Sequence, residues 1–338
     1  MPPLYLTEQG AVLRKEGNRF TVTKDEMTLL TVPSFKVDAV MVFGHVQITT
    51  QAIAFLLENG IDTSFFTIAG RLKGKLAAIE SKNVLLRVRQ FERAKEERFC
   101  FTMAQQIVQA KLANARAVLM RHARNHQEID LKTEIDELGA LVRRVMTEAD
   151  ISIVRGLEGH GSALYFRAFA QMLRAELGFD GRNRRPPTDP VNGMLSLGYV
   201  LLTHELAGLV AAHSFDPYVG FYHDLRYGRV SLALDLVEEF RHPVVDSFVL
   251  WLANKRVMQP DDFTRQEDGG VMLKPEPFKR FLRSYEERMQ RSVHMRTPNS
   301  DTGEDKKITW RDIFRSQVQQ LVHAVQSGEP YQPFFAEG

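Results

Sequence analysis

The spacing of apolar residues changes once along this chain, near residue 80. Before that point, short runs such as RFTVT and VDAVMVF are rich in β-branched and aromatic residues, which is typical of strands. After it, apolar residues recur three and four positions apart, which predicts helices. We expect helices over 82–124, 132–148, 158–176, 190–212, 231–256, 275–292 and 308–326. Strands followed by a block of helices indicate an α+β fold with two domains.

The predicted boundary gives the two domains unequal sizes. Residues 1–80 are expected to form a small β-sheet domain with a single helix over 50–59, which ends at Gly60. Residues 81–338 are expected to form a larger, all-helical C-terminal domain. Because the first domain is too small to bury a generous core of its own, we expect it to bury further surface in a two-fold homodimer.

Composition limits what the chain can bind and where it can act. The net charge is only +2, so any nucleic-acid binding must rest on local basic patches. With a single cysteine, Cys100, the chain has neither an intramolecular disulfide nor a cysteine-based zinc site. The N-terminus lacks the charged and apolar regions of a signal peptide, and no apolar run approaches the ~20 residues that cross a bilayer. We therefore expect a cytoplasmic protein that does not bind membranes.

The segment FYHDLRYGRVSLALDLVEEFR, residues 221–241, places three acids in an apolar helical run. On a helix, Asp235, Glu238 and Glu239 fall on one arc, and the first two can converge because they are three positions apart. Carboxylates held together among apolar neighbours repel and lose hydration, and a bound cation removes both penalties. For this helix alone, the alternative is a solvated face with acids near the positive end of the helix dipole.

His223 precedes Asp235 by twelve residues and Glu238 by fifteen. The loop after it is short enough to fold back beside the helix. This loop carries Arg226 and Tyr227, which suit phosphate contact and base stacking. A histidine followed by converging acids at this spacing favours a metal site over a structural histidine. Oxygen ligands suit Mg²⁺ or Mn²⁺, and an imidazole among them favours Mn²⁺ or Zn²⁺ somewhat.

A third acid, Glu158, is expected at the start of the helix over 158–176. By itself such an acid is most simply a first-turn residue that interacts with the helix dipole. Farther along, the loop GRNRRPPTDP is basic and proline-rich, with Asp189 expected as N-cap and Pro190 at the first helical position. Asn192 then points into an apolar helix and requires a hydrogen-bond partner if it is buried.

Three segments carry a resemblance to a known family. LEGHGSALYF, RRPPTDPVNGMLSLGYVLL and GFYHDLRYGRVSLALDLVEEFRHPVVD closely resemble the CRISPR-associated integrase and endonuclease of spacer acquisition, the Cas-one family. The resemblance runs over nearly the whole chain and includes the order glutamate, histidine, acid. One departure is His242 in FRHP, where many relatives read arginine–proline directly. It puts no ligand in doubt.

The resemblance implies a metal-dependent DNA endonuclease and integrase. Such an enzyme joins a new spacer to the CRISPR array by attack of a DNA 3′-OH on a phosphodiester, and its substrates are double-stranded and branched DNA: the spacer precursor and the CRISPR repeat and leader. The metal, Mg²⁺ or Mn²⁺, would be held by Glu158, His223 and Glu238, with Asp235 as a fourth residue, a further acid that could ligate or orient. Family members form homodimers through the β domain, and two such dimers clamp a dimer of the small Cas-two protein.

Other residues are candidates for contact with DNA. Tyr165, Tyr222 and Arg226 are expected to contact the substrate, and Arg184 and Arg185 to contact the DNA backbone. Further basic candidates for the backbone are Arg87, Arg89, Arg93, Arg182, Lys279, Arg280 and Arg283. Taken separately, each basic segment is better explained as a solvated face. Gathered on one surface, they would give a salt-dependent, sequence-tolerant grip on DNA.

Two other functions stay open at this point. The dipeptide His223-Asp224 suggests an HD-type metal phosphohydrolase, for which His204 and His213 would be further ligands, although neither has a convincing partner acid. The chain could also be a non-catalytic DNA-binding or assembly protein whose site is idle. Metal-dependent cleavage of branched DNA, measured against hydrolysis of a small nucleotide, separates the three possibilities.

Overall fold

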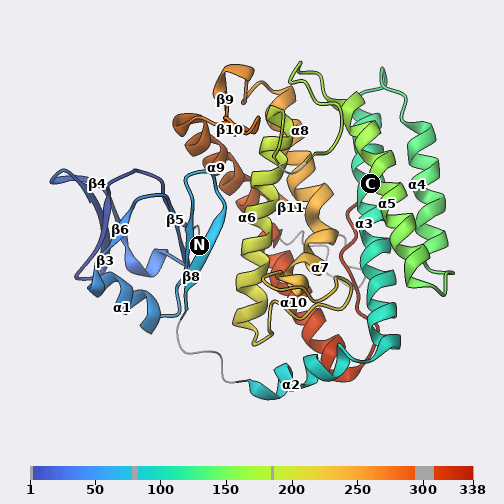
Figure 1. Ribbon diagram of the computed structural model, residues 1–338, viewed down its shortest axis with the longest axis horizontal. Helices are drawn as coiled ribbons and strands as arrows, with labels where there is room; N and C mark the ends of the chain where they lie inside the picture. Colours follow the sequence, from blue (N-terminus) through green and yellow to red (C-terminus); the bar gives the residue numbers. More distant parts are fainter. Residues whose placement is uncertain (1–2, 78–82, 184–185, 294–307, 338) are drawn as a thin grey trace, which may run out of the picture. The chain divides into compact units, whose positions relative to one another are not determined.

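In the computed structural model, residues 3–77, 83–183, 186–293 and 308–337 are described. The chain divides into two compact units, each treated by itself below. The sheet unit comprises Met1–Glu80 and Pro275–Gln290, and the helical unit comprises Ser81–Lys274 and Arg291–Gly338. The four-stranded sheets lie in the first and most of the helices in the second (Figure 1). This arrangement confirms the predicted α+β fold class, with a small N-terminal sheet region followed by a larger helical region.

The sheet unit contains two four-stranded sheets. One has the order β1-β5-β7-β8, in which β1, β5 and β7 are parallel and β8 is antiparallel to β7. The other has the order β4-β3-β2-β6, in which β4, β3 and β2 are antiparallel and β6 is parallel to β2. The bounds are β1 Leu4–Leu6, β2 Val12–Glu16, β3 Arg19–Lys24, β4 Met27–Pro33, β5 Ala39–Phe43, β6 Gln47–Ile48, β7 Asp62–Phe66 and β8 Leu72–Leu76.

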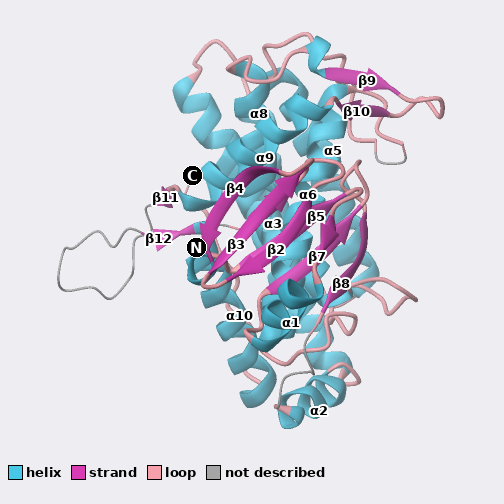
Figure 2. Cartoon of the chain, turned by 90° about the vertical axis from the view of Figure 1, so that its left-hand side faces the viewer, coloured by secondary structure: helices cyan, strands magenta, loops and turns pink. Residues whose placement is uncertain are grey.

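Both sheets and helix α1, Thr50–Glu58, share one apolar core. Phe20 from one sheet, Val40 from the other and Leu56 from the helix are all fully buried in it. Figure 2 shows α1 beside the strands of this unit. The helix begins where the Thr49 side chain accepts a hydrogen bond from a backbone N–H of the first turn, close to the predicted range of 50–59.

Helix α9, Pro275–Gln290, belongs to the sheet unit although most of the helical unit precedes it in the sequence. Phe278 meets Phe43 edge to face, with ring centroids 5.2 Å apart, and Lys279 pairs with Glu8 at 3.1 Å. The predicted division places this segment with the helices. The contacts of α9 differ from that prediction. An amphipathic helix packs on whichever unit covers its apolar face, and the position of the helix in the sequence does not reveal which unit that is.

The helical unit is organised around α3, which packs against α4, α5 and α7 (Figure 1). Its helices are α2 Val84–Arg93, α3 Glu97–Asn125, α4 Lys132–Val145, α5 Ile151–Met172, α6 Pro190–Ala212, α7 Ser231–Phe240, α8 Ser247–Asn254 and α10 Trp310–Ser327. Two small antiparallel ribbons depart from the all-helical prediction. They pair β9 Phe263–Arg265 with β10 Val271–Leu273, and β11 Ser292–Val293 with β12 Ile308–Thr309.

The helix predicted over 231–256 is interrupted by a π-helical turn, Arg241–Asp246, that contains Pro243. Because proline has no N–H, Pro243 cannot donate to the carbonyl of Glu239 four residues earlier. The Nδ2 of Asn114, on α3, donates to that carbonyl instead, at 2.7 Å. The interruption therefore leaves a backbone acceptor through which α3 holds the end of α7.

Helix α5 begins seven residues earlier than predicted, at a cap formed by Asp150, whose carboxylate accepts a backbone N–H at 2.7 Å. Glu158 therefore lies in the third turn of α5, and its predicted first-turn position is wrong. Gly161 permits a close approach to α3, since a Cβ built there would lie 2.2 Å from Cδ2 of Leu112. This close packing brings the face of α5 that carries Glu158 onto α3.

Helix α6 is the one helix of the described ranges that is long and apolar enough, by length and composition, to cross a membrane. This departs from the expectation that no apolar run approaches such a length. Half of the apolar window is buried inside the structure, where α6 packs against α7. Asn192 and His204 are among its buried residues, so polar groups also lie within the apolar stretch.

Candidate active site

The three predicted ligands converge from two helices and a loop of the helical unit. Glu158 comes from α5, His223 from the loop before α7, and Glu238 from α7. The ammonium of Lys111, on α3, contacts Oε1 of Glu158 and lies 2.7 Å from Oε2 of Glu238. Nε2 of His223 lies 4.0 Å from the other oxygen of Glu238. Two carboxylates and an imidazole therefore face one small region.

Asp235 folds the loop back onto α7, as the sequence predicts. Its carboxylate accepts backbone N–H bonds from Phe221 at 2.7 Å, Tyr222 at 3.1 Å and His223 at 2.9 Å, and it lies 2.8 Å from Nδ1 of His223. Gly220 is required beside it, because a Cβ there would lie 2.7 Å from Oδ2 of Asp235 and within 3 Å of the α7 backbone.

The same contacts set the tautomer of His223. A carboxylate only accepts hydrogen bonds, so Nδ1 of His223 carries the proton that it donates to Asp235. Nε2 then keeps its lone pair and faces Glu238. Four donors meet the two oxygens of Asp235, which uses the acceptor capacity of a carboxylate. Of the two alternatives left open for Asp235, these contacts favour orienting over ligating.

Glu238 is buried yet charged. Nη1 of Arg241 lies 3.0 Å from each of its oxygens. Burial raises the pKa of the Glu238 carboxyl, but the positive charges of Arg241 and Lys111 outweigh that effect and hold the pKa well below its usual range. Glu238 is therefore an anion throughout the neutral pH range and is available as a hard oxygen donor.

Glu239 does not share this site, although the sequence places it on the same arc as Glu238. Its oxygens accept hydrogen bonds from the hydroxyl of Tyr331 at 2.6 Å and from the backbone N–H of Phe334 at 2.7 Å. Burial raises the pKa of Glu239 to about 8. Adjacent helical residues point in different directions, so one glutamate faces the site and the next holds the C-terminal segment.

The residues predicted to contact DNA differ in how far they are exposed to solvent. Tyr165 is fully buried, with its ring centroid 4.1 Å from that of His242, so the prediction that it contacts DNA is wrong. Tyr222 is largely buried, whereas Arg226 is exposed on the loop. Arg184 and Arg185 lie outside the described residues.

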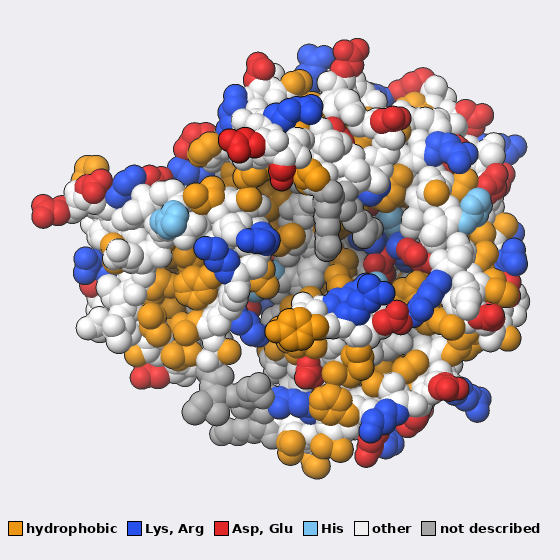
Figure 3. All heavy atoms as spheres, viewed as in Figure 1, with side chains coloured by type: hydrophobic (Ala, Val, Ile, Leu, Met, Phe, Trp, Pro, Cys, Tyr) orange, Lys and Arg blue, Asp and Glu red, His pale blue; other side chains and the backbone are white. Residues whose placement is uncertain are grey.

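Several other basic candidates for DNA contact pair with acids of their own unit. Arg89 pairs with Glu92 at 2.9 Å and Arg93 with Glu96 at 2.7 Å, while Lys279 pairs with Glu8 and Glu276. On the face shown in Figure 3, acidic and basic side chains are interspersed. These ion pairs favour solvated faces for Arg89, Arg93 and Lys279.

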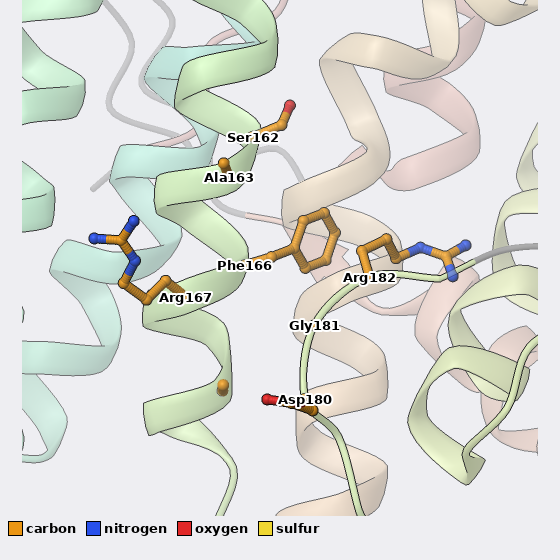
Figure 4. A pocket seen from close by; sticks show the side chains of 8 residues that line it. Ser162, Ala163, Phe166, Arg167, Asp180, Gly181 and Arg182 are labelled. Atoms are coloured by element: carbon orange, nitrogen blue, oxygen red, sulfur yellow. The ribbon is translucent and has the colours of Figure 1, made fainter.

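A pocket of about 590 Å³ lies between α5 and the loop that carries Gly181. Figure 4 shows Phe166 of α5 and Arg182 of the loop on facing sides of it. Ser162 lines this pocket and lies within hydrogen-bonding distance of Glu158, with 3.2 Å between Oγ and Oε1. The pocket therefore adjoins the carboxylate of the site.

The residues that sequence reasoning missed are the two cations of the site, Lys111 and Arg241. Both are buried, with 3% and 7% of their surfaces exposed. Two signals pointed to them: a lysine within the apolar run QIVQAKLANA, and an arginine three residues after Glu238. A charge buried in such a setting requires an anionic partner.

The donor set fits a hard divalent cation, although no ready-made cluster of three metal-binding side chains is present among the described residues. The carboxylates of Glu158 and Glu238 share the Lys111 ammonium, which shows that they reach a common point. His223 presents an imidazole nitrogen with a free lone pair toward Glu238. Two carboxylates and one imidazole suit Mg²⁺ or Mn²⁺ and leave positions open for a substrate.

The HD-type alternative finds no support in the geometry. Asp224, the acid of its dipeptide, is exposed and pairs with Arg155 at 2.6 Å. His213 is directed to the backbone of its own helix, with Nδ1 2.9 Å from the carbonyl of Leu209. These contacts place Asp224 and His213 in local structural roles.

Comparison with known proteins gives consistent results. The sequence model of the family described as "CRISPR associated protein Cas1" matches residues 4–287. The "CRISPR-associated endonuclease Cas1 3" of Thermus thermophilus is 34% identical over 334 residues, which cover 98% of this chain and 96% of that relative.

Solved structures share the fold. A chain of the "Cas6-RT-Cas1--Cas2 complex" has a TM-score of 0.81 and 26% identity; the match covers 99% of this chain but only 36% of that longer one. A "Casposase bound to integration product" has a TM-score of 0.84 and 22% identity, with 98% of this chain and 93% of that chain covered. The chain therefore belongs to the Cas1 family of CRISPR-associated endonucleases, and it is a DNA endonuclease and integrase of CRISPR adaptation.

Proposed function

We propose that Glu158, His223 and Glu238 form the metal-dependent centre at which this enzyme joins spacer DNA to the CRISPR array. The observation that carries the proposal is the convergence of two carboxylates and one imidazole lone pair on the region occupied by the Lys111 ammonium. When bound there, Mg²⁺ or Mn²⁺ would supply Lewis-acid stabilisation of the charge that develops on the phosphodiester.

The other residues of the site act on the ligands. Asp235 orients His223 and, in the neutral ring, places the proton on Nδ1, so that the lone pair of Nε2 faces Glu238. Arg241 holds Glu238 in place through contacts to both carboxylate oxygens. Arg226, exposed on the same loop, is proposed to contact the DNA backbone, because its guanidinium suits phosphate oxygens.

We also propose the partners of the enzyme. Its substrates are double-stranded and branched DNA, and it assembles with the small Cas2 protein, as its similarity to a chain of the Cas6-RT-Cas1--Cas2 complex suggests. A homodimer through the sheet unit is supported by the exposed apolar residues of β4, an edge strand. We propose that the protein acts in the cytoplasm, where the CRISPR array lies.

The test of this function is a strand-joining assay. Spacer DNA with a labelled 3′-OH end is incubated with leader–repeat DNA, Cas2 and Mn²⁺, and joined product is measured. Glu238→Ala is expected to abolish joining, because it removes an anionic donor from the site, while DNA binding in EDTA persists. The matched control is Glu137→Ala, which removes an exposed glutamate of α4 and should leave joining unchanged. Wild-type joining by Glu238→Ala would contradict the assignment.

A complementary pair of variants separates binding from catalysis. Replacing Arg184 and Arg185 together with alanine is expected to weaken binding to branched DNA, and more visibly as salt rises, because phosphate contacts release counterions. The affinity for Mn²⁺ should not change. Filter binding across a salt series and a metal titration on the same preparations measure the two effects. Unchanged DNA binding at every salt concentration would remove these arginines from the proposed interface.

A further inference from the structure

Lys111 lies at the centre of the proposed metal site. Its side chain is 4% exposed, and its ammonium contacts Glu158 and lies 2.7 Å from Glu238, whose side chain is 8% exposed. A lysine charge buried this deeply requires anionic partners, since burying an isolated ammonium is very costly. The two carboxylates have the same requirement. The Lys111 ammonium therefore neutralises the same two carboxylates that a divalent cation would bind.

The charges of the two glutamates and of the cations that contact them balance without a metal. The carboxylates of Glu158 and Glu238 face the ammonium of Lys111 and the guanidinium of Arg241, which gives two negative and two positive charges. A divalent cation on the same oxygens would lie beside the ammonium, and the two like charges would repel strongly in a buried setting. The ammonium and the metal cannot both hold these oxygens closely.

Lys111 is also able to withdraw, whereas Arg241 is not. Arg241 contacts both oxygens of Glu238 from the turn directly after α7, so these two contacts hold its guanidinium in place. Lys111 reaches the oxygens from α3 on a flexible four-carbon chain. Loss of its contacts leaves α3 in place, because Asn114, one turn along the same helix, is bonded to the backbone of Glu239.

We propose that Lys111 is a tethered counter-ion of the metal site. It neutralises Glu158 and Glu238 in the metal-free protein, and a divalent cation binds only by displacing its ammonium from their oxygens. This inference rests on the proposed metal site. It predicts that the lysine stabilises the metal-free protein and, by the same contacts, weakens the affinity for metal.

The test measures metal binding directly, without reference to catalysis. Isothermal titration of the full chain with Mn²⁺ is compared for the wild type and Lys111→Met, which keeps a similar length and removes the charge. The variant is expected to bind Mn²⁺ about tenfold more tightly, because no ammonium has to be displaced. Its metal-free melting temperature should fall by several degrees, and saturating Mn²⁺ should raise that temperature more than in the wild type.

The control is Lys255→Met, which makes the same substitution at an exposed lysine just after α8. It should change neither the affinity nor the melting temperature. If Lys111→Met does not fold, Lys111→Gln replaces it, and an intermediate gain in affinity is expected because the amide still donates to one carboxylate without a charge.

The outcomes separate this inference from the function on which it rests. If the wild type binds Mn²⁺ and the Lys111 variants bind it with the same or a lower affinity, the counter-ion role is wrong. The proposed metal site is then unaffected. A further variant, Glu158→Gln, serves as the reference for a damaged site. If the wild type bound Mn²⁺ no better than Glu158→Gln, the proposed metal site would be wrong and the counter-ion role would be lost with it.

Discussion

The carboxylate of Asp235 determines how His223 is presented. It accepts three backbone N–H groups of the loop and faces Nδ1 of the imidazole at 2.8 Å. A group so fully bonded acts through its neighbour and has no acceptor capacity left for a metal. The interaction resembles the carboxylate–histidine arrangement that supports many metal sites.

Asp235→Asn tests this positioning role. The amide keeps the shape of the side chain but places an NH₂ group where an oxygen accepted hydrogen bonds, so Nδ1 no longer has a fixed acceptor. We expect Mn²⁺ affinity and strand joining to fall by about 10- to 100-fold. Asp224→Asn, on the exposed part of the same loop, is the control and should retain both. Equal losses in the two variants would argue against a specific role for Asp235.

Residue-level prediction worked where spacing constrained geometry. The twelve- and fifteen-residue separations from His223 predicted its convergence with Asp235 and Glu238, which the structure shows. Lys111 was not predicted, because its position depends on how α3 packs against α5 and α7. Tyr165 was wrongly expected to contact the substrate. An aromatic residue at helical spacing more often packs in the core, as Tyr165 does.

Between elements, a polar connection beside the site joins α3, α7 and the segment after α10. Asn114 donates to the carbonyls of Glu239 and Phe334 and accepts from the N–H of Ala336 at 2.7 Å. Glu239 in turn accepts the hydroxyl of Tyr331 and the N–H of Phe334. The last turn of α7 is thus held by a segment that is distant in sequence.

The raised pKa of Glu239 gives this connection a pH dependence. The folded-state pKa of about 8 exceeds the unfolded value of roughly 4.3. The folded protein therefore favours the protonated carboxyl, and the resulting stability is complete below the unfolded pKa and is lost as pH rises through about 8. We expect the melting temperature to fall between pH 6 and 9, and Glu239→Gln, which mimics the protonated form, to flatten that fall. An identical slope in the variant would show that other groups cause it.

Element-level prediction failed where a tertiary contact decided the outcome. The start of α5 was placed at residue 158, whereas the helix begins at Ile151 and contains Gly156, Gly159 and Gly161, which are poor helix formers. Of these, Gly161 packs closely against Leu112 of α3, a contact that no local pattern encodes. The assignment of α9 to the sheet unit depends likewise on Phe43 and Phe278, which are far apart in sequence.

On the scale of the whole molecule, one edge of the second sheet pairs with no further strand among the described residues, and this edge favours a partner. Strand β4 lies at the end of the order β4-β3-β2-β6, and Met27, Leu29 and Leu30 on it are 66%, 46% and 42% exposed. Phe35, just after the strand, is 69% exposed. Apolar side chains along an open edge favour association with another chain.

The homodimer proposal therefore has a specific test. Leu29→Lys is expected to shift the protein from dimer to monomer, since a charge placed in an apolar interface loses its hydration. Light scattering coupled to size exclusion at micromolar concentration measures the mass. Leu72→Lys, at an exposed leucine of the other sheet, is the matched control and should stay dimeric. A wild type that is monomeric at this concentration would refute the proposal.

The connection between Asn114, Glu239 and residues 331–336 also has a consequence for synthesis. The ribosome makes α3 and α7 long before Phe334, which lies 220 positions after Asn114 and 95 after Glu239. Until that segment emerges, the partners of the Glu239 carboxyl are missing, and the end of α7 beside the site has incomplete support. A nascent chain that has not yet exposed residues 331–336 should therefore join DNA poorly, because the end of α7 beside the site is not fully held.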